Sequence, residues 1–338
     1  MEIDAAGRVV ALSSPEKVFF EARGETKLDL VRYFLAVEQP VLRAIGGRPV
    51  LMERYPDGAS GKSFFQKRVP KGAPAWLETA VVSTPNGTSS DALVVADIAH
   101  VVWAVNLGCL GFHAWPSRAA DLAHADELRI DLDPQPGVTL AMVREAAAEA
   151  RALLVEVGLE GFPKTTGRDG IHVYCRLEPR YDPYQVRAAA VAFARELERR
   201  RGDLITAQWW KEDRGRRVFC DFNQNAPHKT VFAAWGARPR PTGQVSMPFR
   251  WEDLEAVEPD AFSIATVPGL VAERGDPWEA IDARPGSLDL LLAWSERDLA
   301  DGLMDAPWPP VYPKMPNESP RVSASRARKP PPEEADDG

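Results

Sequence analysis

Hydrophobic residues recur at helical spacing in three stretches of the chain. The spacing predicts helices over residues 26–45, 140–157 and 182–200. The first helix is expected to begin with a capping box formed by Thr26 and Asp29, because the side chain of each can bind the backbone N–H of the other. We expect each helix to bury its apolar side against a sheet.

Between the predicted helices, short segments alternate hydrophobic and polar residues, which is typical of strands. They cover residues 128–133, 171–176 and 217–222, and a further apolar segment, residues 230–235, is expected to pair with the last of them. Strands that alternate with helices in this way predict an α/β (α+β) fold.

The composition narrows the class of protein. The chain has 338 residues, of which 45% are hydrophobic and 27% charged, so it can bury a large core. Its net charge of −8 excludes a protein that wraps nucleic acid non-specifically but leaves room for a local basic groove. The 3 cysteines form no Cys-x-x-Cys pair, and no apolar run approaches the ~20 residues of a membrane span. We therefore expect a monomeric, cytoplasmic (nucleoid-associated) protein without a zinc ribbon, a disulfide framework or a membrane span.

The C-terminal part of the chain is rich in proline. We expect a catalytic domain of two interleaved lobes over residues 1–305, followed by a tail, residues 306–338, that is extended or disordered. A basic cluster in this tail, Ser325–Lys329, could contact nucleic acid, although simple solvation explains it better.

Asp131 and Asp133 are the first candidates for chemistry. Alternation along the strand places both on one face, where carboxylates roughly 6.5–7 Å apart between Cα atoms can bind one divalent cation or two adjacent ones. A third carboxylate, Asp221, is expected on a neighbouring strand and would complete a two-metal site for phosphoryl transfer. Oxygen ligands without cysteine favour Mg²⁺ or Mn²⁺ over Zn²⁺. The alternative is a pair of solvated carboxylates on an edge strand.

Two segments resemble phosphate-binding loops. The Thr-Thr-Gly-Arg loop that precedes His172 exposes backbone N–H groups. Thr166 adds a hydroxyl, and Lys164 and Arg168 add positive charge. An ordinary turn followed by a buried histidine explains the same pattern. The other segment, residues 58–63, lacks a glycine that the Walker loop requires because residue 56 is proline, which excludes a P-loop ATPase.

Basic and aromatic residues occur together in parts of the chain. Arginine and lysine residues surround Asp221, a patch over residues 62–68 contains Phe64 and Phe65, and Lys17 and Lys27 lie near the N-terminus. Cations for phosphates and aromatic faces for bases are what contact with nucleic acid requires. The aromatic residues could equally belong to the core.

Together these segments resemble the polymerase domain of bacterial ATP-dependent (non-homologous end-joining) DNA repair ligases, in the archaeo-eukaryotic primase superfamily. The resemblance extends from about residue 17 to about residue 251. It rests on segments in the family's order: Lys17–Phe20, Arg48-Pro49, Trp76-Leu77, Asp131–Pro134, the Thr-Thr-Gly loop before His172, Val218–Asp221, Gln224-Asn225 and Lys229-Thr230. It implies a two-lobed primase-polymerase fold with an RRM-like catalytic sheet. No ligase motif Lys-x-Asp-Gly occurs, so we expect a stand-alone relative of the actinobacterial type.

The resemblance also implies roles for individual residues. The metal-binding carboxylates are matched by Asp131, Asp133 and Asp221. The nucleotide site is matched by Thr166 and His172 at the triphosphate, His113 near the sugar, Arg214 on a mobile loop that organises primer and nucleotide, and Arg238 and Arg240 at basic positions near triphosphate or DNA. The DNA site is matched by Lys17 and Lys27 at the 5′-phosphate across a gap and by Phe64 and Phe65 against the template. The family carries lysine where this chain has Asp169, and we expect Arg168 to supply the missing charge.

The leading hypothesis is a template-directed nucleotidyltransferase that adds nucleotides to a primer 3′-hydroxyl at short gaps or broken ends. We expect two Mn²⁺ or Mg²⁺ ions as cofactors, NTP or dNTP and 5′-phosphorylated gapped or broken DNA as substrates, and a separate DNA ligase or end-binding protein as partner. Three alternatives stay open: a primase that starts new chains, a two-metal nuclease, and a non-catalytic module that binds gaps or ends. The loop before His172 disfavours the nuclease, because hydrolysis needs no triphosphate site.

Overall fold

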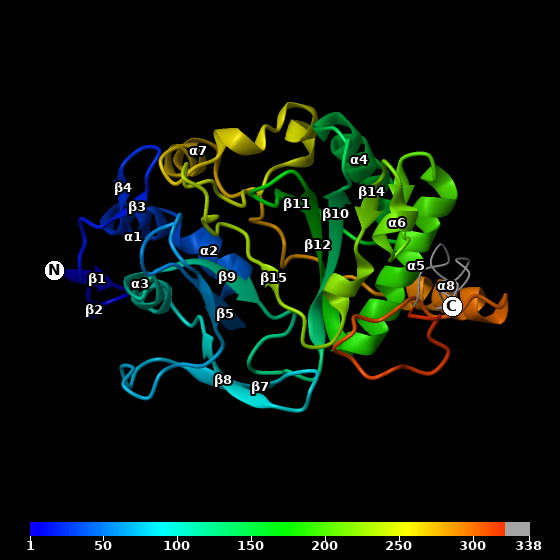
Figure 1. Ribbon diagram of the computed structural model, residues 1–338, viewed down its shortest axis with the longest axis horizontal. Coiled ribbons are helices and arrows are strands. Elements are labelled where there is room, and N and C mark those ends of the chain that lie inside the picture. Colours follow the sequence, from blue (N-terminus) through cyan, green and yellow to red (C-terminus); the bar gives the residue numbers. More distant parts are fainter. Residues whose placement is uncertain (322–338) are drawn as a thin grey trace, which may run out of the picture.

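Two β-sheets organise residues 1–321, the part of the chain that the computed structural model describes (Figure 1). Each sheet has its own hydrophobic core, so the molecule divides into two lobes. The chain builds most of the first lobe, continues through the second, and then returns to add one strand to the first sheet.

The first lobe contains an antiparallel sheet in the order β15-β9-β5-β8-β7, with β6 paired to β5. Its strands are β5 (Pro49–Arg54), β6 (Phe64–Gln66), β7 (Thr79–Ser83), β8 (Ser89–Val94), β9 (Cys109–Ala114) and β15 (Val231–Phe232). Two N-terminal strand pairs belong to this lobe: β1 (Glu2–Ala5) with β2 (Arg8–Ala11), and β3 (Val18–Phe20) with β4 (Glu25–Thr26). Its helices are α1 (Lys27–Ala36), α2 (Glu38–Ile45) and α3 (Ile98–Asn106).

The second lobe contains the sheet β11-β12-β10-β14-β13, in which only the β13–β14 pair is parallel. Its strands are β10 (Ala125–Pro134), β11 (Phe162–Thr165), β12 (Ile171–Tyr181), β13 (Ile205–Thr206) and β14 (Val218–Cys220). The helices α4 (Leu140–Glu156) and α5 (Pro183–Arg201) share its core, and Figure 1 shows them on the side of the sheet that faces away from the first lobe.

Short helices complete the described chain. They are α6 (Lys211–Arg214), η1 (Phe222–Asn225), η2 (Trp251–Ala256), η3 (Pro259–Ala261), α7 (Val267–Arg274) and α8 (Asp289–Ala300). The helix α8 packs against α5 at the outer side of the second lobe (Figure 1).

The two faces of β10 explain how this sheet positions chemistry. Leu128, Ile130 and Leu132 are buried in the core under α4 and α5. The residues between them therefore project from the opposite face, toward the first lobe. This confirms the alternation that the sequence predicts for residues 128–133.

Buried ion pairs join the lobes beside β10. Arg48, which immediately precedes β5, donates hydrogen bonds to both carboxylate oxygens of Asp126 at 2.6 and 2.9 Å and lies 3.0 Å from Glu127. Arg176 on β12 also pairs with Glu127. Breaking one partner of such a buried set typically costs about 3–5 kcal/mol. The network therefore fixes the first sheet relative to the strand that carries the candidate carboxylates.

The predicted helices form, with one difference. The helices α4 and α5 match the prediction, and Asp182 caps α5 by accepting hydrogen bonds from the backbone N–H groups of Tyr184 and Gln185. The predicted helix over residues 26–45 is instead two helices that meet at Val37. The reason is Pro40, because in a continuous helix its ring would clash with the carbonyl of Ala36.

The predicted strand over residues 230–235 has a different partner. Only Val231–Phe232 of this segment forms a strand, β15, and this strand pairs with β9 in the first lobe, not with β14. Both edges of β14 are already taken by β10 and β13. The strand predicted over residues 217–222 is also shorter than expected, since β14 ends at Cys220 and Asp221 begins the short helix η1.

Residues 306–321 are packed, which differs from the expected disordered tail. Trp308 and Tyr312 are buried, and the Tyr312 hydroxyl donates a hydrogen bond to the Pro227 carbonyl. Residues 322–338, which include the basic cluster, lie outside the described residues. For that part the tail remains a prediction.

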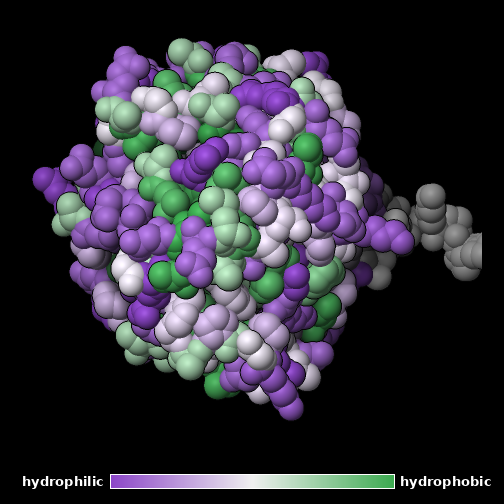
Figure 2. All heavy atoms as spheres, turned by 90° about the vertical axis from the view of Figure 1, so that its left-hand side faces the viewer, coloured by the Kyte–Doolittle hydropathy of each residue, from purple (hydrophilic) through white to green (hydrophobic). Residues whose placement is uncertain are grey.

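The surface of the first lobe is mixed in character. Figure 2 views it from the side of the N-terminus and shows mostly hydrophilic side chains with smaller groups of hydrophobic ones among them. Within residues 1–321, none of the helices combines the length and the apolar character that crossing a membrane requires.

Candidate active site

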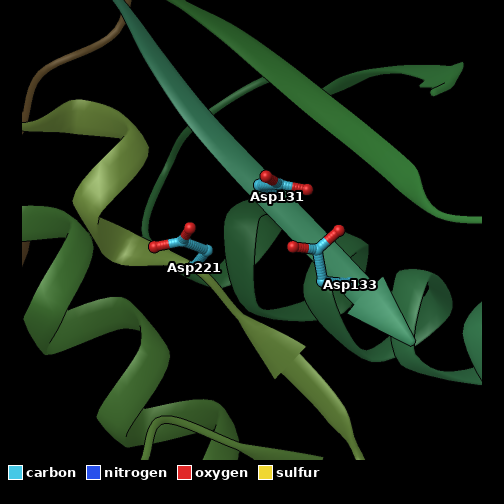
Figure 3. Close-up of side chains that lie close together, drawn as sticks. All are labelled: Asp131, Asp133 and Asp221. Carbon is cyan, nitrogen blue, oxygen red and sulfur yellow. The ribbon is translucent and has the colours of Figure 1, made fainter. Parts of the chain in front are cut away.

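Three carboxylates converge where β10 and β14 lie side by side. Asp131 and Asp133 project from β10, and Asp221 follows the last residue of β14 (Figure 3). The pairing of Leu132 with Cys220 brings them together, and the Asp221 backbone N–H donates to the Asp131 carbonyl at 2.8 Å. One oxygen of each carboxylate lies within 4.8 Å of an oxygen of the other two.

Burial raises the free-energy cost of ionising these three carboxyl groups. Removal from water raises the pKa of Asp131 to about 7 and that of Asp221 to about 7, and the charge of Asp131 adds to the rise at Asp221. Burial and the neighbouring Asp131 also raise the pKa of Asp133 to about 6. Like charges this close repel unless a cation lies between them.

The residues present fit divalent cations. The Asp131 Oδ1 atom is buried and has no hydrogen-bond partner, although His172 Nε2 lies 3.0 Å away. Burial lowers the pKa of His172 well below its usual value, so the imidazole is neutral and cannot balance the carboxylates. A cluster of carboxylate oxygens without a thiolate is the donor set of Mg²⁺ and Mn²⁺.

Asp131 and Asp133 line a cavity of about 490 Å³ between the lobes, and Asp221 lies next to them. The second lobe lines it with Asp131, Asp133, Pro134, Thr166, Arg168, Asp169, Gly170, His172 and Gln224, while Glu53, His113 and the returning segment with Thr230, Val231, Phe232 and Arg238 line the rest. A cavity of this size is typical of small-molecule sites. The two lobes together therefore form the candidate site.

The loop before His172 forms one wall of the cavity. The Thr166 hydroxyl oxygen accepts hydrogen bonds from the backbone N–H groups of Arg168 at 3.2 Å and Gly170 at 3.3 Å, which closes the loop. Gly167 has φ of +69°, a conformation that favours glycine. The side chains of Arg168 and Asp169 are exposed and reach the cavity with opposite charges.

Arg238 holds this loop from the returning segment. Its Nε donates to the Thr166 carbonyl at 2.6 Å, and its guanidinium carbon lies 3.5 Å from the centre of the Phe232 ring. Burial lowers the pKa of Arg238 to about 10, so it stays charged at neutral pH. The structure thus places a fixed positive charge opposite the carboxylates.

His113 and an aromatic group form the opposite wall. His113 Nε2 lies 3.2 Å from Glu53 Oε2, and the rings of Phe65 and Phe232 lie edge-on to the imidazole at 5.3 Å each. Phe64 and Phe65 are about half exposed on β6, which identifies them as surface residues and not core. Phe65 is linked to the cavity through His113, and its exposed ring leaves room for a stacked base.

Two predicted site arginines do not line the cavity. Arg214 is buried at the end of α6, donates to the carbonyls of Gln208 and Trp209, and lies 3.5 Å above the Phe219 ring. The charges of Asp221 and Asp133 still act on it. Arg240 is half-buried two residues beyond Arg238. Their predicted roles remain predictions.

Lys17 and Lys27 lie together but away from the carboxylates. The backbone N–H of Lys27 donates to the Lys17 carbonyl at 2.8 Å. Lys17 is partly exposed and pairs with Asp57 at 2.8 Å. Lys27, however, is buried, and its ammonium donates to the carbonyls of Ser13 and Asn106 at 2.8 and 3.1 Å. Its geometry suits a structural role better than a contact with a phosphate.

Sequence reasoning missed some residues of the site. Glu53 lies on a short strand with no strong pattern, so nothing marked it as a partner of His113. Gln224 follows Asp221 and donates from Nε2 to Asp221 Oδ2 at 2.9 Å. Lys164 was expected to add charge to the loop, but it is buried and donates to Ser246 Oγ at 2.7 Å. Burial lowers the pKa of Lys164 well below its usual value.

Comparison with known proteins decides the family. The family model described as "LigD, primase-polymerase domain" matches residues 26–278. The chain belongs to this LigD family. The multifunctional non-homologous end joining protein LigD of Mycolicibacterium smegmatis is 32% identical over 314 residues, which are 91% of this chain and 40% of that protein. The bifunctional LigD of Bacillus subtilis is 30% identical over 268 residues, or 79% of this chain and 43% of that protein. The chain thus spans less than half the length of these LigD relatives.

A solved structure supports the same LigD assignment. The polymerase domain of Mycobacterium tuberculosis Ligase D, in complex with DNA, superposes with a TM-score of 0.76 and 31% sequence identity. The match covers 82% of this chain and 99% of that one. It confirms the predicted resemblance and the mixed α/β fold.

Proposed function

We propose that this chain is a metal-dependent, template-directed nucleotidyltransferase that extends a primer 3′-hydroxyl at short gaps or broken DNA ends. The observation that carries the proposal is the convergence of Asp131, Asp133 and Asp221, the first two of which line the cavity between the lobes. Carboxylates that converge within a cleft of this size can serve both a nucleotide and the end of a primer.

The three carboxylates would hold two Mn²⁺ or Mg²⁺ ions. When bound, such ions supply Lewis-acid activation of the attacking hydroxyl and neutralise charge on the phosphates. Buried donors and raised pKa values make metal binding compete with protons, so we expect binding to weaken as the pH falls through about 7.

The remaining cavity residues would bind and orient the nucleotide. The guanidinium groups of Arg238 and Arg168 line the space beside the carboxylates, where a triphosphate needs donors. The neutral His172 can donate one hydrogen bond without adding charge. His113, held by Glu53, would lie against the sugar.

DNA is the proposed polymeric substrate. The relative from M. tuberculosis has been solved in complex with DNA, and the LigD relatives are named as proteins of non-homologous end joining. In this chain the exposed Phe64 and Phe65 would stack on template bases, and Lys17 would meet a downstream 5′-phosphate. A separate ligase or end-binding protein would complete the repair.

The experiment compares the wild-type protein with the Asp131→Ala variant. Substrates are a short 5′-phosphorylated gap, a nick and an unprimed template, each offered with ribo- or deoxyribonucleotides and Mn²⁺ or Mg²⁺. We expect the variant to lose extension by at least about a thousandfold while its DNA affinity changes little. Asp203→Ala is the matched control, because this exposed carboxylate contacts Arg201 and does not line the cavity.

The outcomes separate the alternatives. Extension of the unprimed template indicates a primase, and loss of labelled DNA without nucleotides indicates a nuclease. Extension that survives in Asp131→Ala would reject the proposed site. DNA binding without any extension in the wild-type protein would favour a non-catalytic module.

A further inference from the structure

A segment beyond the family match packs against η1, the short helix that follows Asp221. The match to the family model ends at residue 278, whereas residues 303–321 continue along the second lobe. We call this stretch the C-terminal segment. It folds back on itself, because the Asp305 N–H donates to the Asn317 carbonyl at 2.9 Å and the Ser319 N–H donates to the Asp305 carbonyl at 3.0 Å.

Arg187 on α5 joins this segment to the rest of the lobe. Its guanidinium is buried and donates to Asp305 Oδ1 at 3.0 Å and to the carbonyls of Ala306 and Pro307 at 2.8 and 3.3 Å. The Trp308 ring lies over it, with 3.8 Å between the guanidinium carbon and the ring centre. A planar group with five donors can make these contacts at once, whereas lysine cannot.

Arg187 is also linked to Asp221 through Asn223. Arg187 Nε donates to Asn223 Oδ1 at 2.8 Å, and Asn223 Nδ2 donates to the Pro307 carbonyl at 3.0 Å. Both ends of the Asn223 amide are therefore held. The Asn223 backbone N–H in turn donates to Asp221 Oδ1 at 2.9 Å.

We propose that Arg187, Asn223 and the C-terminal segment are positioning elements of the metal centre, which hold the short helix η1 so that Asp221 faces Asp131 and Asp133. Because the metal centre belongs to the proposed function, this inference rests on that function.

The need for such a support follows from the geometry. Asp221 lies beyond the end of β14 as the N-cap of η1, a helix of 4 residues that has little stability of its own. Repulsion from the other two carboxylates favours turning Asp221 away. The hydrogen bonds from Asn223 and Gln224 oppose that turn only while η1 is itself fixed. Asn225 ties η1 to β10 through two hydrogen bonds with the Arg129 backbone, and Arg187 holds it from α5.

The test is Mn²⁺ titration by calorimetry, without DNA or nucleotide, on the full chain. In Arg187→Lys and in Asn223→Ala we expect the Mn²⁺ dissociation constant to rise about tenfold, the equivalent of one or two hydrogen bonds. The double variant should be little worse than either single one, since both act through the same link. Primer extension should recover at high Mn²⁺ concentration, which a general loss of folding would not allow.

Arg195→Lys is the matched control. Arg195 also lies on α5 and donates to the same segment, at the Met304 carbonyl, but it does not contact η1. We expect its Mn²⁺ affinity to stay within about twofold of wild type. If Arg187→Lys fails to fold, Trp308→Ala removes the ring that covers the guanidinium and should weaken Mn²⁺ binding about threefold.

Two results overturn the inference: unchanged Mn²⁺ affinity in a folded Arg187→Lys or Trp308→Ala variant, or an equal loss in Arg195→Lys. Failure of the proposed function is a separate result. A wild-type protein that binds Mn²⁺ through Asp131 but never extends a primer would reject the polymerase and leave this positioning role intact.

Discussion

Replacement of Asp131 by asparagine should stabilise the metal-free protein at high pH. The carboxyl has a pKa of about 7 in the folded protein against an ordinary value of 3.8, because burial disfavours its charged form. A carboxyl whose pKa is raised by folding destabilises the fold when it is ionised. That penalty shrinks as the pH falls below the folded pKa and is lost only below the unfolded pKa. The asparagine variant carries no such penalty.

The magnitude follows from the two pKa values. One pKa unit corresponds to about 1.4 kcal/mol, so the penalty for a carboxyl with these values is about 4 kcal/mol at pH 8 and about 2 kcal/mol at pH 5. A buried asparagine amide costs about 1–3 kcal/mol at either pH. The advantage of Asp131→Asn over wild type should therefore shrink by about 2–3 kcal/mol between pH 8 and pH 5.

Urea denaturation in the presence of EDTA measures this difference. Added Mn²⁺ should reverse its sign, because the wild-type protein gains about 2.7 kcal/mol at a metal concentration 100 times the dissociation constant and the variant gains much less. A stability difference between the two proteins that does not change with pH would refute the argument from burial. A difference that Mn²⁺ leaves unchanged would refute the metal site.

Three further predictions concern the rest of the site. Phe65→Ala should raise the KM for gapped DNA about fivefold or more in steady-state extension assays, with kcat little changed, because the exposed ring is free to stack on a base. Lys17→Ala should abolish the preference for a 5′-phosphorylated gap in gel-shift assays, whereas Lys27→Ala should lower the free energy of unfolding by about 1–3 kcal/mol, because the Lys27 ammonium is bound to buried carbonyls. Gly167→Ala should raise the KM for nucleotide about tenfold, since the new Cβ would lie 2.6 Å from Arg238 Cγ at a φ of +69°; an unchanged KM would show that the loop does not bind the triphosphate.

The candidate carboxylates could be found from the chain because their signal is local. Alternation along β10 places Asp131 and Asp133 on the face opposite Leu132, whatever the rest of the fold does. The same reasoning worked less well for Asp221. A strand was predicted over residues 217–222, but the chain leaves the sheet after Cys220, and Asp221 caps η1.

The predictions failed where the structure depends on something that local hydrophobic periodicity does not record. The helix break at Val37 depends on one proline, which a periodic pattern does not reveal. The partner of β15 depends on which strand edges are free, and hydrophobicity alone does not record that. The burial of Lys164 and Lys27 depends on carbonyls and hydroxyls supplied by distant segments.

The sequence alone determined the α/β class, the two carboxylates on one strand face and the family that the chain resembles. These properties come from side-chain alternation and from short motifs, which need only neighbouring residues. Only the tertiary structure decided that Asp221 meets this pair, that Glu53 and His113 form the opposite wall, and that residues 303–321 hold η1 from behind. Such contacts join residues far apart in the chain, and their geometry is set by how the sheets pack against each other.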